Sequence, residues 1–127
     1  MNRYNRLMEK INAGECILID GATGTEVERR GVPQLKNAWN GGGALSHPGI
    51  VRKIHQDYIS RGAEVIISNT FATTKHALAD ARQEANFETL NKRGVELAIE
   101  AREPLNKTMC WSLVASLIGL GLGKNPH

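Results

Sequence analysis

The segment CILIDGATGTE at residues 16–26 decides the fold that we expect for this chain. It opens with the continuous apolar run Cys16–Ile19, which is typical of a strand buried on both faces, as in a parallel sheet. The glycines that follow permit a tight turn, and Thr23 and Glu26 have the spacing of a capping box. We therefore expect a strand, a turn and then a helix that ends at Arg30 or one residue before it.

The same alternation continues downstream. A helix is predicted from Ser46, a potential N-cap with Pro48 in the first turn, as far as Gly62. Val65–Ile67 forms a second short apolar run and Met109–Ala115 a third, and further helical patterns lie between them. Such short strand–helix–strand connections require crossovers, so the strands should be parallel. Together these features predict an α/β class.

Two other segments flank these elements. Tyr4, Leu7, Met8 and Ile11 have the spacing of one face of an amphipathic helix at the N-terminus. Residues 34–45 include three consecutive glycines and have no helix or strand period, so they predict a loop.

The composition is that of one ordinary globular domain. The chain has 127 residues, 41% of them hydrophobic and 23% charged, with a net charge of +3. The basic residues are dispersed, which argues against a nucleic-acid-binding patch. The N-terminus has no apolar signal-peptide core, and no apolar stretch is long enough to span a bilayer. We expect a cytoplasmic protein with no nucleic-acid or membrane partner.

Polar clusters follow the first two predicted strands. In parallel α/β folds, ligands bind at the carboxyl ends of strands. Here Asp20 could bind an ammonium group, while backbone N–H groups near the helix start could bind a carboxylate. Ser68 and Asn69 could add neutral hydrogen bonds. This chemistry suits an amino acid, although Asp, Ser and Asn at such positions also form caps and turns.

Other reactive side chains give weaker indications. Cys16 and Cys110 form neither a CxxC pair nor a cluster with His, and we expect both thiols to be buried. His55 is interpreted as a packing or solvent-contacting residue rather than a catalytic base, and His47 as part of a helix cap. Trp39 is either a lid residue or a plug over the core.

Taken together, these segments resemble the homocysteine S-methyltransferase family. The resemblance rests on Ile17–Gly31, on the loop around Trp39 and on His47–Thr74, which contains the sequence SNTF. It continues more weakly through Asn91–Arg102, and it covers residues 14–103 overall.

The resemblance implies a (β/α)8 barrel that transfers a methyl group to the sulfur of homocysteine and forms methionine. It implies a methyl donor as second substrate and zinc held by cysteine thiolates. Asp20, Gly21 and Ala22 would bind the amino acid end of homocysteine. Ser68, where the family usually has threonine, and its neighbour Asn69 would complete this substrate site.

The chain departs from the family pattern toward its C-terminus. A barrel needs roughly 250 residues, so 127 residues would supply only the first two or three β/α units and an N-terminal helix. The family's zinc cysteines lie on later strands, and neither Cys16 nor Cys110 corresponds to them. Residues 104–127 diverge, with VASLI where the family resembles VAGSI. We therefore expect no metal ligands in this chain, and a truncation, a frameshift or an incomplete gene would each explain the pattern.

Two other hypotheses remain open. The chain could be a non-catalytic half-barrel that associates with itself or with a partner through unpaired sheet edges. Alternatively, DGATGT could be a phosphate-binding turn in another α/β enzyme, although it lacks the lysine of a P-loop.

Overall fold

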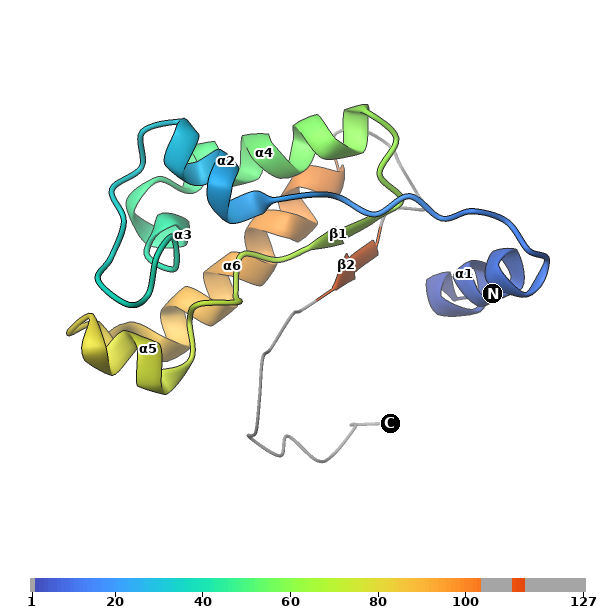
Figure 1. Cartoon of the computed structure of the whole chain (residues 1–127). Coiled ribbons are helices and arrows are strands. Elements are labelled where there is room, and N and C mark those ends of the chain that lie inside the picture. Colours follow the sequence, from blue (N-terminus) through green and yellow to red (C-terminus); the bar gives the residue numbers. More distant parts are fainter. Residues whose placement is uncertain (1, 104–110, 114–127) are drawn as a thin grey trace.

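A computed structural model describes residues 2–103 and 111–113 of the chain (Figure 1). Helices dominate this part, and two short strands lie among them. The elements, in chain order, are α1 (Arg3–Asn12), α2 (Thr23–Arg29), α3 (Gly43–Ser46), α4 (Pro48–Ser60), β1 (Val65–Ile67), α5 (Lys75–Asp80), the 3-10 helix η1 (Glu84–Asn86), α6 (Phe87–Arg102) and β2 (Trp111–Leu113). Helices separate β1 from β2 as predicted, but four helices precede β1 in a row, and the described residues do not close into a barrel.

The sheet is parallel, as the short crossovers predicted. β1 pairs with β2 in the register Val65 to Trp111 and Ile67 to Leu113. On its other edge, β1 forms a parallel bridge between Val65 and Ile19. The third apolar run is thus confirmed as a strand at Trp111–Leu113, whereas its flanking residues lie outside the described part of the chain.

The prediction that Cys16–Ile19 forms a buried strand is wrong. The segment is extended beside β1, and two bonds join it to β1: Asp20 N–H donates to Val65 O and Val65 N–H to Leu18 O. However, Leu18 is 54% and Ile19 62% exposed, and Cys16 is an exposed free thiol. The apolar composition of residues 16–19 suits a strand that is covered on both faces. Within residues 2–103 and 111–113, however, the segment has only β1 as a neighbouring strand, and its side chains stay exposed.

The core lies between the helices rather than inside the sheet. α4 and α6 pack against each other, and Val51, Ile54 and Ile59, whose helical spacing forms one apolar stripe along α4, are fully buried. Figure 1 shows α6 running diagonally from α5 up to α4. The larger cluster of buried side chains joins α2, α4, α5 and α6, and a smaller one groups Ile59 and Ile66 with alanines of α6.

Both side-chain caps predicted from sequence are absent. α2 begins at Thr23, but Ala22 is its N-cap residue and provides no side-chain bond. Glu26 instead forms ion pairs with Arg29 and Arg30. Ser46 ends α3, a short helix that overlaps the end of the segment 34–45 predicted as a loop, and His47 occupies the N-cap position of α4. Cap identity depends on where the chain turns, which residue type alone does not determine.

α1 is confirmed, and it lies apart from the other helices (Figure 1). None of its residues is buried, and Lys10 joins it to the rest through an ion pair with Glu64, just before β1. No helix in the described part of the chain is long and apolar enough to cross a membrane. The cytoplasmic location and the absence of nucleic-acid partners stay predictions.

Candidate functional site

A cavity of about 580 Å³ opens at the carboxyl end of β1. Three segments far apart in sequence form its wall: the turn into α2, the loop before α3 and the residues that follow β1. Four of the five predicted site residues line it, namely Gly21, Ala22, Ser68 and Asn69. The sheet thus brings together the two polar clusters that the sequence places after separate apolar runs.

Asp20, the fifth predicted residue, lies beside this wall and is only 7% exposed. Its Oδ2 accepts a hydrogen bond of 2.9 Å from the N–H of Ile67, the last residue of β1. Its Oδ1 is buried, with no hydrogen-bond partner among the described residues. Burial raises the pKa of this carboxyl, because desolvation penalises the charged form, and the bond from Ile67 only partly offsets the effect. A buried carboxylate oxygen with no donor is an incomplete arrangement that a bound cation would complete.

The turn after Asp20 is held by Tyr58 of α4. The Tyr58 hydroxyl donates to the carbonyl of Ala22 at 3.2 Å. A Cβ atom on Gly21 would lie 2.9 Å from the same hydroxyl oxygen, so only glycine fits here without a shift of Tyr58. Gly21 is therefore required for close approach rather than for an unusual backbone angle.

Ser68 and Asn69 are buried in the turn after β1, with exposures of 3% and 4%. The Ser68 hydroxyl lies 3.0 Å from the hydroxyl of Thr70. Asn69 Nδ2 donates to the carbonyl of Asn40 at 3.1 Å, across the cavity wall. These polar groups are therefore oriented by neighbours and do not cap a helix.

Sequence reasoning missed Asn40 and Phe71, which also line the cavity. Phe71 stacks on Trp39 with ring centroids 5.9 Å apart, and both rings are about half exposed. Trp39 thus lies at the cavity mouth and not over the core, which favours the lid interpretation. Asn40 has no recognisable sequence signal, since its role depends on contacts with Asn69 and with Gly24.

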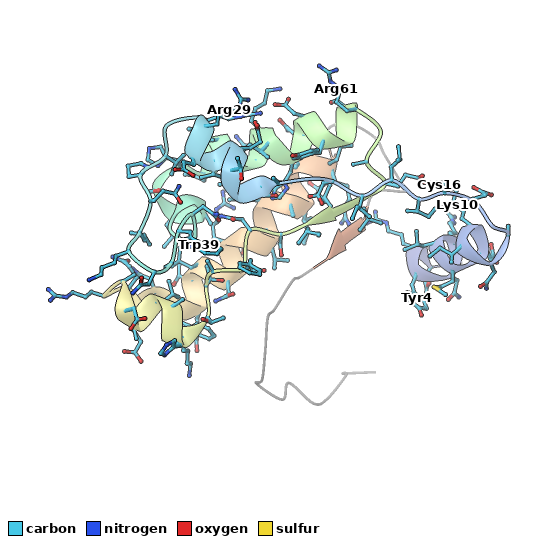
Figure 2. All side chains as sticks on the ribbon, in the orientation of Figure 1. Tyr4, Lys10, Cys16, Arg29, Trp39 and Arg61 are labelled. Carbon is cyan, nitrogen blue, oxygen red and sulfur yellow. The ribbon has the colours of Figure 1, made fainter. Side chains whose placement is uncertain are left out.

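The remaining reactive side chains lie elsewhere. Figure 2 shows Cys16 near α1, at the opposite end of the sheet from Trp39. The prediction of a buried Cys16 thiol is wrong, and Cys110 lies outside the described residues. His55 is fully buried on α4, where it packs in line with Val51 and Ile59. Its two ring nitrogens have no partner in the part of the chain that the structure describes, and burial lowers its pKa to about 4.

No group of three or more His, Cys, Asp or Glu side chains lies close enough to hold a metal ion within residues 2–103 and 111–113. The cavity wall also carries no cysteine. Zinc bound by cysteine thiolates therefore does not fit the donors found in this part of the chain.

Comparison with known proteins identifies relatives of this chain. The family model described as homocysteine S-methyltransferase matches residues 17–122. The chain belongs to the homocysteine S-methyltransferase family. The resemblance seen in residues 14–103 is thereby confirmed, and the family match also extends to residue 122, into the segment expected to diverge.

Individual members of the homocysteine S-methyltransferase family agree with this assignment. The chain is 33% identical to the homocysteine S-methyltransferase of Escherichia coli over 104 residues, which cover 81% of this chain and 34% of that protein. It is 36% identical to the selenocysteine methyltransferase of Astragalus bisulcatus over 92 residues, which cover 72% of this chain and 27% of the relative. The chain thus spans about a third or less of these relatives.

A solved structure has the same fold over the shared region. The metallated form of the homocysteine methyltransferase MmuM from Escherichia coli superposes with a TM-score of 0.70 at 33% identity. The superposition covers 90% of this chain and 40% of that structure.

Proposed function

We propose that this chain forms the amino-acid-binding part of a homocysteine S-methyltransferase barrel. In the complete domain, a methyl group would pass from a donor to the sulfur of homocysteine, which would give methionine. Family membership and the cavity at the carboxyl end of β1 support this proposal. The observation that carries it is the buried, unpartnered Oδ1 of Asp20 beside that cavity.

The site residues would divide the recognition of the amino acid between them. Asp20 would accept hydrogen bonds from the ammonium group, which would restore its charged form and satisfy Oδ1. Ser68 and Asn69 would contribute neutral hydrogen bonds from the turn after β1. Gly21 and Ala22 would leave room for the backbone of the ligand, with the turn fixed by Tyr58.

The partial barrel is part of the same proposal. Residues 17–20, β1 and β2 would be three neighbouring parallel strands, with α4 and α6 as their crossover helices. Zinc is expected for the complete family domain, but the described residues provide no thiolate cluster for it. We therefore propose that the isolated chain binds homocysteine weakly and transfers no methyl group.

The experiment that tests this proposal is calorimetric titration of the chain with homocysteine and with 4-mercaptobutyrate, which lacks only the amino group. We expect wild type to prefer homocysteine by roughly tenfold or more, as one charge-assisted hydrogen bond would give. Asp20→Asn keeps an acceptor for the N–H of Ile67 but removes the charge. It should therefore bind both ligands equally.

Two results would contradict the proposal. Equal affinity of wild type for the two ligands would remove Asp20 as the ammonium site. Methyl transfer by the purified chain, together with stoichiometric zinc, would mean that the chain contains a complete catalytic site.

Asp20→Asn should also stabilise the unliganded chain by about 1 kcal/mol at neutral pH, because no uncompensated charge remains buried.

A second candidate function is favoured by the exposed edge at Leu18 and Ile19. These side chains are more than half exposed on an extended segment whose backbone pairs with β1 on one edge, and residues 2–103 and 111–113 add no strand on the other. Unpaired strand edges invite pairing with another chain. A non-catalytic half-barrel that self-associates, or that binds a partner chain, would use this edge.

A further inference from the structure

The turn that carries Ser68 and Asn69 is supported from behind by α6. Thr70 and Thr73 follow these residues and are 3% and 1% exposed, which is unusual for polar residues in a loop. Thr70 N–H donates to the carbonyl of Ser68 at 2.8 Å. The Thr73 hydroxyl lies 2.7 Å from Asn91 Oδ1 on α6 and 3.0 Å from the carbonyl oxygen of Thr70, two acceptors that share its single hydrogen. The loop is therefore held both by bonds within it and by bonds to α6.

Asn91 of α6 makes the decisive contacts with this loop. Its Nδ2 donates to the carbonyl of Thr73 at 2.9 Å and to that of Phe87 at 2.8 Å. Its Oδ1 lies 2.7 Å from the hydroxyl oxygen of Thr73. Both neighbours of Nδ2 are carbonyl oxygens, so the amide orientation is fixed: both hydrogens of Nδ2 are used, and Oδ1 accepts. No other residue type of this size offers two donors and one acceptor in this arrangement.

Gly94 brings α6 close enough for these bonds. It lies three residues after Asn91, on the same face of the helix. A Cβ atom at this position would lie 2.9 Å from Thr70 Cγ2 and 3.2 Å from the carbonyl oxygen of Asn69. The helix backbone thus packs directly against the residues that present Ser68 and Asn69 to the cavity.

We propose that Asn91 is a positioning residue, which with Gly94 holds the Ser68–Asn69 turn in its cavity-lining geometry. Asn91 touches no ligand in this scheme and acts through Thr73 and Thr70. On the cavity side, the carbonyl of Asn40 holds the same turn through Asn69. The effect on ligand affinity rests on the proposed function, whereas the effect on the loop does not.

The test combines amide hydrogen exchange of residues 68–74, measured by NMR, with homocysteine titration of the same variants. Asn91→Asp replaces both donors by a carboxylate that faces two carbonyl oxygens, and the milder Thr73→Val removes only one hydroxyl. Each should accelerate exchange of the Thr70 amide and weaken homocysteine binding by roughly tenfold, as expected for the loss of buried hydrogen bonds. Thr73→Val should retain the fold even if Asn91→Asp does not.

Two controls separate positioning from general destabilisation. Asn86→Asp makes the same chemical change five residues earlier, in η1, where Nδ2 donates to Gln83 and not to the loop. Val32→Ala destabilises the buried core beyond α2. Neither should change affinity or accelerate exchange selectively in residues 68–74.

The outcomes are distinguishable. Unchanged loop exchange in Thr73→Val overturns the proposal whether or not homocysteine binds, and so does faster exchange with unchanged affinity. Faster exchange in a chain whose wild type fails to bind homocysteine supports the positioning role and removes the proposed function instead.

Discussion

His55 shows how a single buried side chain makes stability depend on pH. It is fully buried without hydrogen-bond partners, and its pKa falls from 6.5 to about 4. The unfolded chain therefore binds a proton at a higher pH than the folded chain does. The contribution of neutral His55 to the free energy of unfolding is fully present above about pH 6.5. It is lost as the pH falls toward 4, by roughly 3 kcal/mol in total.

Replacement of His55 by methionine should remove this dependence. Methionine fills a similar volume and brings no polar atom into the core. Urea denaturation at pH 7 and pH 4.5 would measure the difference between wild type and His55→Met at each pH. The variant should gain stability relative to wild type as pH falls, whereas a constant difference would mean that His55 is solvated or paired in the folded chain.

Gly24 is a second residue at which local geometry affects the cavity. A Cβ atom here would lie 2.1 Å from Asn40 Nδ2, at the end of a side chain that can rotate. Gly24→Ala should therefore cost little stability, about 1 kcal/mol or less, but it should displace Asn40 from the cavity wall. We expect weaker homocysteine binding with an almost unchanged melting temperature.

Gly49 provides the matched control. It lies in α4, and a Cβ atom there would meet nothing within 4 Å. Gly49→Ala should leave binding unchanged and stabilise the chain by about 0.5–1 kcal/mol, because alanine loses less backbone entropy in a helix. Equal binding by the two variants would show that Asn40 does not shape the site.

At the level of elements, α5 has a side-chain cap that the sequence analysis did not identify. Thr74 Oγ1 accepts the N–H of Ala77 at 3.2 Å. Thr74→Ala should lower the free energy of unfolding by about 1 kcal/mol, the usual value of an N-cap. Ser46→Ala is the comparison, since Ser46 has the right residue type but caps no helix. Equal losses in chemical denaturation would contradict this assignment.

For the whole molecule, the exposed strand edge predicts self-association. Ile19 is 62% exposed on that edge, whereas Leu45, 40% exposed, lies in α3. Light scattering should detect oligomers of wild type that dissociate on dilution. Ile19→Lys should shift the chain toward the monomer, because a charge on an edge strand opposes pairing, and Leu45→Lys should have no such effect. A wild type that stays monomeric at high concentration would exclude the half-barrel assembly.

Local patterns predicted the helices well. The apolar stripe of α4 and the spacing in α1 depend on contacts between near neighbours, so the sequence carries them directly. The same patterns failed for Leu18 and Ile19, because apolar composition does not specify whether a neighbour covers a segment. They also failed for the caps, since Thr23 and Ser46 have suitable side chains but each lies one residue from the cap position.

Some features of the candidate site could likewise be predicted from the sequence, and others could not. Glycine-containing and polar clusters after apolar runs were sufficient to place Asp20, Gly21, Ala22, Ser68 and Asn69 near one another, because parallel strands share a carboxyl edge. Only the tertiary structure disclosed the unpartnered Asp20 oxygen, the contact of Asn40 with Asn69 and the support from Asn91. These features join residues 18 to 47 positions apart, and such contacts depend on how the helices pack, which no local pattern in the sequence encodes.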